Sequence, residues 1–224
     1  MKKKKTKIKL KGLIIILIII LLAVSVFFLY RSLRVKNIYV TGNKLLKEYE
    51  IIDMASLKDY PHLYEVNIKN IEKSIKSNPL VKSVKINKTL LGKITISIEE
   101  NIVLYQDQNN KYVLSNRERI DLEIPFLGVP TLINDPDGLE EKLIDKMNVI
   151  DQDILSRISE IEYKPNDLDK ERFMFYMSDG NYVYVTLSKM NLINSYNEIY
   201  PTLEGKKGIL YLDSGNHFQI KKNN

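Results

Sequence analysis

Residues 77–86 read Ser-Asn-Pro-Leu-Val-Lys-Ser-Val-Lys-Ile and form a junction between a helix and a strand. Pro79 ends the helix, because the residue before a proline avoids the α region of backbone space. The strand is predicted over Val81–Lys88, and in it Val84 and Ile86 return to the core that the helix covers. The junction therefore predicts a helix that is followed at once by a strand packed against it.

Two amphipathic helices are predicted upstream of this junction. The nearer helix starts after Asn67, whose side chain can cap the first free N–H groups. Its apolar stripe consists of Ile68, Ile71 and Ile75 at helical spacing. A shorter helix precedes it, with a predicted core face of Leu45, Tyr49, Ile52 and Ala55.

Strands stand on both sides of these helices. Val35–Thr41 is rich in β-branched and aromatic residues and ends at the turn signal Gly42-Asn43. Lys93–Glu100 alternates between isoleucine and polar residues, and Leu90-Leu91-Gly92 forms the hairpin that leads into it. The predicted order from residue 35 to about 101 is strand, helix, helix, strand, strand.

An unbroken apolar run lies before all of these elements. Leu13–Tyr30 carries no charge, and as a helix it would reach about 27 Å, close to the roughly 30 Å hydrocarbon core of a bilayer. Seven lysines precede it, which predicts a cytoplasmic basic tail at 1–12 and export of everything after the span. A cleaved signal peptide is the alternative, with Ala23 and Ser25 as the nearest small residues.

Charge and composition argue against several classes of function. The chain of 224 residues has a net charge of +6, but seven of its 34 basic residues lie in the tail, which leaves 27 basic against 28 acidic residues. The exported part is therefore nearly neutral, which argues against nucleic-acid binding. The chain has no cysteine, which excludes disulfides, thiolate nucleophiles and zinc–thiolate sites.

The five-element order just outside a single span resembles the POTRA module of the FtsQ/DivIB family of bacterial cell-division proteins. Three segments carry the resemblance: Ile38–Asn43, Ser77–Ile86 and Ile94–Glu100. The segment around Pro79 is the most specific of the three. The resemblance implies a POTRA domain at 31–101 after a transmembrane helix at 13–30.

The second half of the chain resembles the β-domain of the same family. A Ser178-Asp179-Gly180 turn predicts a hairpin, and Gly208–Asp213 predicts a late apolar strand, with a candidate extension at His217–Ile220. The fold class is predicted as α+β, with a mixed α/β β-domain at 102–220 that holds an antiparallel sheet, and a short tail at 221–224. Other predicted strands cover 103–105, 111–114, 119–122, 172–177 and 181–187. Helices are predicted at 139–151 and over a short stretch that contains Ile154, Ile158 and Ile161. A last helix is predicted at 188–200, and Pro201 stops or kinks it.

Groups for catalysis are scarce. His62 and His217 are the two histidines, and we expect both at the surface; no serine-nucleophile, phosphate-loop or HExxH pattern occurs. Three Asp-x-Asp pairs could suggest a metal, but turns and helix starts explain them better. We therefore predict no catalytic residue, no cofactor and no metal site. The three pairs are Asp135 with Asp137, Asp151 with Asp153, and Asp167 with Asp169.

The resemblance implies a non-enzymatic division protein at the septum, single-pass in the cell membrane, with its C-terminal domains extracytoplasmic. Its partners would be small single-span division proteins of the FtsL and FtsB/DivIC types, and the POTRA domain offers a second docking surface for other septal proteins. The alternatives are a signal-anchored cell-wall enzyme with an unfamiliar site and, more weakly, a translocation protein. A predicted edge strand would pair with the partners through Ile209, Leu210, Tyr211, Leu212 and Asp213, with Tyr196 and Tyr200 as further contacts.

Overall fold

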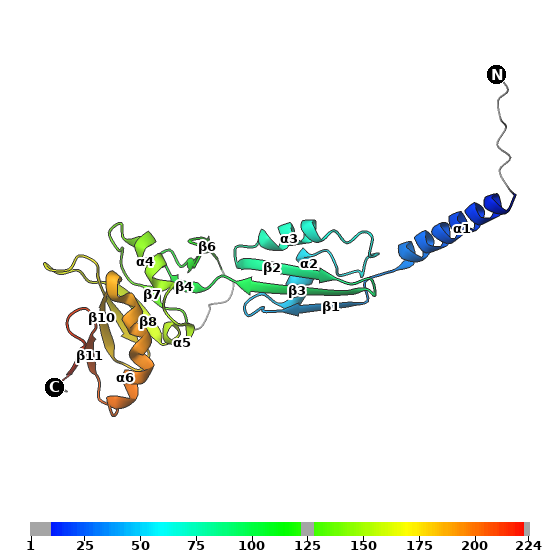
Figure 1. The fold of residues 1–224 in the computed structure, drawn as a ribbon. Coiled ribbons are helices and arrows are strands. Elements are labelled where there is room, and N and C mark those ends of the chain that lie inside the picture. Colours follow the sequence, from blue (N-terminus) through cyan, green and yellow to red (C-terminus); the bar gives the residue numbers. More distant parts are fainter. Residues whose placement is uncertain (1–9, 122–127, 222–224) are drawn as a thin grey trace, which may run out of the picture. The chain divides into compact units, whose positions relative to one another are not determined.

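The computed structural model describes residues 10–121 and 128–221 (Figure 1). Several predictions fall outside these ranges: most of the basic tail, the end of the predicted strand 119–122, and the tail at 222–224. The chain divides into two compact units, Met1–Glu100 and Asn101–Asn224.

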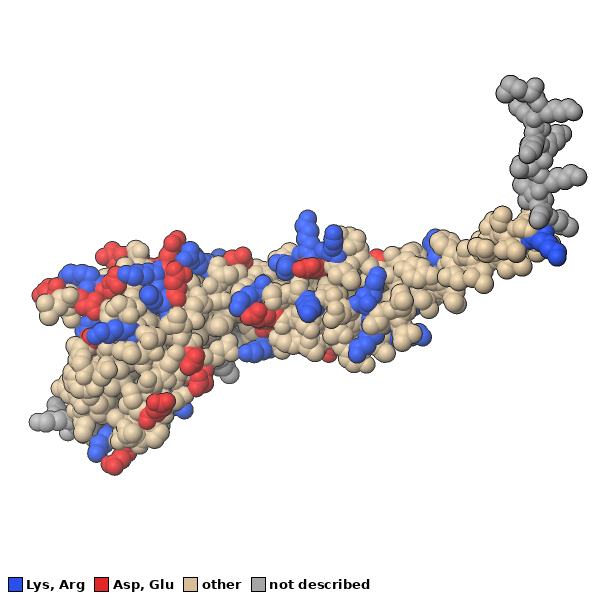
Figure 2. Space-filling model, viewed as in Figure 1, with Lys and Arg blue, Asp and Glu red and all other residues tan. Residues whose placement is uncertain are grey.

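Helix α1, Leu10–Ser32, contains the apolar run. It is the one helix within the described residues that is long and apolar enough to cross a membrane, with a mean hydropathy of 3.4. Figure 2 shows an uncharged surface along most of its length. Its large apolar side chains are exposed.

The rest of the first unit has the predicted β-α-α-β-β order. A three-stranded sheet runs in the order β1-β3-β2, in which β1 is parallel to β3 and β2 is antiparallel to it. The predicted bounds of the last two strands agree with the structure residue for residue. The elements are β1 Asn37–Thr41, α2 Glu48–Met54, α3 Ile68–Lys76, β2 Val81–Lys88 and β3 Lys93–Glu100.

The core of this unit lies between the sheet and its two helices. Asn67 caps α3 as predicted, because its Oδ1 accepts from the backbone N–H of Lys69 at 3.0 Å. The predicted face of α2 is wrong in part. Leu45 lies before α2, which begins at Glu48, and within the helix Tyr49 is 63% exposed whereas Ile51 is fully buried.

The second unit holds a nine-stranded sheet in the order β12-β11-β10-β9-β8-β7-β4-β5-β6. Its helices cover one face, where they bury a cluster of aliphatic and aromatic side chains, and no helix of the described residues covers the other face (Figure 1). The elements are β4 Val103–Gln106, β5 Tyr112–Leu114, β6 Arg119–Ile120, β7 Thr131–Leu132, α4 Glu140–Met147, α5 Gln152–Leu155, β8 Ile158–Tyr163, β9 Arg172–Met177, β10 Tyr182–Thr186, the 3₁₀ helix η1 Leu187–Ser195, α6 Tyr196–Thr202, β11 Gly208–Tyr211 and β12 His217–Ile220.

The sheet is mixed rather than purely antiparallel. β9 and β10 form the predicted hairpin, but β11 pairs parallel to β10. The reason is the connection: η1 and α6 carry the chain back along the sheet before β11 starts, and such a crossover yields parallel strands. This connection starts as a 3₁₀ helix where a single α-helix was predicted, and it continues past Pro201 to Thr202.

Ile158 and Ile161 lie in strand β8, so the prediction that a helix covers them is wrong. Their spacing of three residues imitates a helical stripe. A register shift between Ile158 and Glu160 inserts an extra residue into the strand, so that both isoleucines are buried.

Candidate partner-binding site

The outer strand at the C-terminal side of the large sheet is β12, and β11 lies inside it. The prediction that Ile209–Asp213 forms the edge is therefore wrong. A turn through Gly215 and Asn216, both with positive φ, folds His217–Ile220 back onto β11 in antiparallel register. The candidate extension of the sequence is thus the edge strand itself.

The pairing of these two strands depends on close approach at Gly208. A Cβ built on Gly208 would overlap the carbonyl oxygen of Gln219 and come within 2.8 Å of the Phe218 ring. On its other side, the Gly208 N–H donates to Oδ1 of Asn181 at 3.0 Å. Gly208 therefore fits between β12 and the start of β10 because it lacks a side chain.

The direction of the backbone groups in β12 follows from the register. Lys221 donates its N–H to the carbonyl of Lys207, which lies directly opposite. Because hydrogen-bonded and non-hydrogen-bonded pairs alternate along an antiparallel ladder, Phe218 and Ile220 direct their N–H and C=O groups away from β11. No strand in the part of the chain that the structure describes pairs with these groups, which form the open edge of the sheet.

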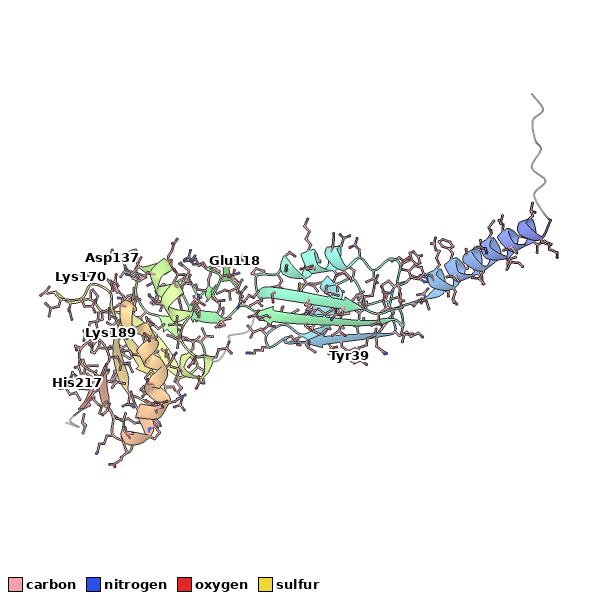
Figure 3. All side chains as sticks on the ribbon, viewed as in Figure 1. Tyr39, Glu118, Asp137, Lys170, Lys189 and His217 are labelled. Atoms are coloured by element: carbon pink, nitrogen blue, oxygen red, sulfur yellow. The ribbon has the colours of Figure 1, made fainter. Side chains whose placement is uncertain are left out.

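The uncovered face of the sheet carries a row of stacked side chains across four strands, which we call the stacked row: Arg172, Tyr184, Tyr211 and His217. The Arg172 guanidinium lies 3.4 Å from the Tyr184 ring centroid, and Tyr184 stacks on Tyr211 at 5.4 Å. His217, labelled in Figure 3, stacks on Tyr211 at 4.6 Å. Arg172 also pairs with Asp213 at 2.6 Å, so its charge is already neutralised.

An open groove of about 610 Å³ lies on the same face, beside the stacked row. Its lining is largely apolar, and β12 forms one of its walls. Tyr176 and Tyr182 meet edge to face at 5.3 Å in it, and the Lys221 ammonium lies 5.3 Å from the Tyr182 ring. The lining residues are Met174, Tyr176, Tyr182, Ile209, Gln219, Ile220 and Lys221.

A hydrogen bond fixes the wall of the groove on its β8 side. Tyr176 donates to Glu162 at 2.6 Å, and Lys164 pairs with the same carboxylate at 3.1 Å. Burial and this hydrogen bond raise the pKa of Tyr176, so its hydroxyl stays protonated. Burial would raise the pKa of Glu162, but the donors outweigh it and hold that pKa below its ordinary value.

Tyr196 is fully buried, so the prediction that it contacts a partner directly is wrong. Its hydroxyl donates to Asp179 at 2.8 Å and accepts from the Asn181 amide at 3.0 Å. Since Asn181 also accepts from the N–H of Gly208, this network ties α6 to the β9–β10 turn and to the start of β11. Tyr196 therefore positions the strand that holds the edge.

The other predicted contact residues divide between the two faces of the sheet. Leu210 and Leu212 are buried in the core, whereas Ile209 and Tyr211 lie on the uncovered face. Tyr200 is half-buried and stacks on Tyr196 at 6.1 Å. Leu212 and Asp213 lie beyond the end of β11, in the turn to β12.

Two of the three Asp-x-Asp pairs have an aspartate that forms a turn, whereas Asp151, at the start of α5, makes no side-chain capping hydrogen bond. Asp135 accepts from the N–H of Asp137 at 2.8 Å, and Asp169 accepts from that of Glu171 at 2.8 Å, as turn-forming aspartates do. His62 is half-buried and stacks on Tyr64, whereas His217 is exposed. Residues 10–121 and 128–221 hold no group of three or more His, Cys, Asp or Glu placed to bind a metal ion.

The sequence prediction missed the groove, the stacked row and the role of Gly208. A signal for the edge strand was present, since Ser214-Gly215-Asn216 between two apolar stretches is a turn pattern. The groove leaves no such signal, because its lining comes from two separate segments of the sequence, β9–β10 and β11–β12, which the fold brings side by side.

Residues 33–101 match the family model of the FtsQ-type POTRA domain. Cell division protein DivIB of Bacillus subtilis strain 168 is 30% identical over 197 residues, which cover 83% of this chain and 74% of that protein. Cell division protein DivIB of Listeria monocytogenes EGD-e is 29% identical over 209 residues, which cover 88% of this chain and 76% of that protein. A solved structure, the major extracytoplasmic domain of the trans isomer of DivIB from Geobacillus stearothermophilus, is 22% identical with a TM-score of 0.38 and covers 47% of this chain and 96% of that one.

Proposed function

Because this chain belongs to the DivIB family of cell division proteins, as its sequence motifs predicted, we propose that it is a non-enzymatic scaffold of the bacterial division septum. Family membership supports a role in the division machinery. The finer proposal is that the protein holds other membrane division proteins through the edge of its second unit. Its partners are small single-span proteins of the FtsL and FtsB/DivIC types.

The proposed topology places the N-terminus in the cytoplasm and both units outside it. Helix α1 has the length and hydropathy for one crossing. The seven lysines before the apolar run outnumber the basic residues that directly follow it, and positive charge favours the cytoplasmic side. Partners with single spans would then meet the second unit on the outer side of the same membrane.

The observation that carries the proposal is the open edge of β12 beside an apolar groove. The outward N–H and C=O groups of Phe218 and Ile220 can pair with an extended partner segment, which adds one more strand to the sheet. Ile209, Gln219 and Ile220 line the groove next to that edge. Alternate side chains of the partner could therefore enter the groove while its backbone pairs with β12.

The test is a proline at the edge. Ile220→Pro removes one outward donor and leaves the bonds between β12 and β11 in place, since prolines are tolerated where the N–H faces away from the sheet. Ile220→Ala is the matched control, because it removes the 54% exposed side chain and keeps the donor. Full-length protein is used to capture FtsL-type and DivIC-type partners from solubilised membranes.

We expect Ile220→Pro to lose capture and Ile220→Ala to keep most of it. Hydrogen exchange at β9 and β10 checks that both variants retain the sheet. Equal capture by the proline variant and the unaltered protein would reject pairing at this edge.

A further inference from the structure

Two adjacent leucines are exposed at the tip of the β2–β3 hairpin. Leu90 is 73% exposed and Leu91 is 83% exposed. Tight hairpins are usually made from polar residues and glycine, and here Gly92 alone meets the conformational need, with a φ of +88°. The geometry of the turn therefore gives no reason for two leucines in water.

The hairpin lies next to the point where the chain leaves α1. The carbonyl of Gly92 accepts from the N–H of Lys36 at 2.8 Å, and a Cβ on Gly92 would come within 2.5 Å of the carbonyl oxygen of Arg34. Arg34 follows the last residue of α1, Ser32, by two positions, a reach of at most about 7 Å. The ribbon in Figure 1 likewise places the β2–β3 turn at the end of the sheet where β1 begins.

A second segment meets the same exit. The N–H of Val35 donates to the carbonyl of Pro61 at 3.0 Å, and that of Leu63 donates to Leu33 at 2.9 Å. This segment carries Tyr60 and Tyr64, which are both exposed. Tyr64 also contacts α1, because the Arg31 guanidinium lies 4.5 Å from its ring centroid.

We propose that this end of the POTRA domain rests on the outer leaflet of the membrane that α1 crosses, with Leu90 and Leu91 inserted among the lipids. The inference rests on the proposed membrane span. Tyr60 and Tyr64 lie at headgroup level, where tyrosine is enriched. We call these four residues the lipid-facing tip.

The short distance between the hairpin and the end of the apolar run indicates that lipid covers Leu90 and Leu91. The apolar run ends at Tyr30, and two further helical residues add about 3 Å before the extended segment begins. The hairpin thus lies within about 10 Å of the hydrocarbon boundary, and the headgroup layer itself is roughly 5–8 Å thick on each side. A leucine side chain at the tip can cross the remaining distance.

Charge around the tip fits a lipid surface as well. Arg34, Lys36 and Lys93 are exposed beside the hairpin. Each cation near a membrane surface is attracted to anionic headgroups. Of the acidic residues in the adjoining loop, Glu65 accepts from the N–H of His62 at 3.1 Å, and Asp59 is exposed.

The absence of cysteine allows a direct test with single-cysteine variants of the full chain. Leu91→Cys carries an environment-sensitive fluorophore, and the protein is reconstituted in phosphatidylcholine–phosphatidylglycerol vesicles that contain nitroxide-labelled acyl chains. Leu168→Cys is the matched control, since Leu168 is 98% exposed in the other unit. Leu17→Cys, within the apolar run, reports separately on the membrane span.

We expect a blue shift of the emission and nitroxide quenching at 91, neither of them at 168, and strong quenching at 17. Adding Leu90→Asn to the labelled Leu91→Cys protein should reduce the quenching at 91. If the probe at 17 is quenched and the probe at 91 behaves like that at 168, the docking proposal is overturned and the span survives. If the probe at 17 is not quenched, the membrane span itself fails, and the docking proposal with it.

Discussion

The carbonyl oxygen of Gln219 occupies the space that a side chain on Gly208 would need. The two residues belong to β11 and β12, and Gln219 lies next to the residue directly opposite Gly208. Any larger residue at 208 must push the edge strand away. The presence of the open edge therefore depends on this one glycine.

Gly208→Ala should detach β12 and leave the rest of the sheet folded. Overpacking of this kind costs about 1–3 kcal/mol, and among the described strands β12 pairs with β11 alone. Hydrogen exchange should rise at 217–220 and stay slow in β9, and partner capture should fall. The exposed Lys206→Ala is the control. Unchanged protection of 217–220 in the alanine variant would contradict the role of Gly208.

Tyr196→Phe should destabilise the second unit by about 1–3 kcal/mol, because the Asn181 amide loses its buried acceptor. Tyr200→Phe is the matched control in the same helix. Tyr200 uses its ring to contact Tyr196 and Arg157, and phenylalanine keeps a ring there. Urea denaturation followed by circular dichroism measures both variants, and equal midpoints would show that the network contributes nothing.

Alkaline pH should weaken the second unit. The pKa values of Tyr105 and Tyr196 are raised, first by burial and then by the neighbouring carboxylates Glu140 and Asp179. In the unfolded chain a tyrosine titrates near about 10. Above that pH the unfolded state releases protons that the folded state retains, so stability is complete below pH 10 and is lost as the pH rises. The urea midpoint should fall as the pH rises above about 10, and less steeply in Tyr196→Phe. Parallel falls would show that Tyr196 does not contribute.

Local sequence signals were enough to predict an element and its buried face where a single helical or strand periodicity decides both. Asn67 and Pro79 bound α3 by their own backbone chemistry, and the alternation in β3 matches its buried face. The prediction failed where tertiary contacts decide which residues of an element face the core. The bulge in β8 gives Ile158 and Ile161 a helix-like spacing, and in α2 Ile51 rather than Tyr49 is buried.

The site was predictable only as a region. The apolar pattern of Gly208–Asp213 identified a strand near the C-terminus, but edge or interior position depends on which segment pairs next to it. Tyr196 was singled out on the correct helix and proved to be buried, because its hydroxyl finds Asp179 and Asn181 inside the fold. The periodicity of the sequence gives no sign of a hydrogen bond between side chains that are distant in the sequence.

The length of β12 limits how tightly any companion can be held. A strand of four residues with two outward-facing positions offers about four main-chain bonds at most, and Arg172 already covers the Tyr184 ring next to the groove. Strand pairing over so short an edge favours brief, reversible association. If both molecules are tethered to one bilayer, as proposed, their effective concentration rises. Confinement to the membrane surface, more than the strength of the strand pairing, would then keep the assembly together.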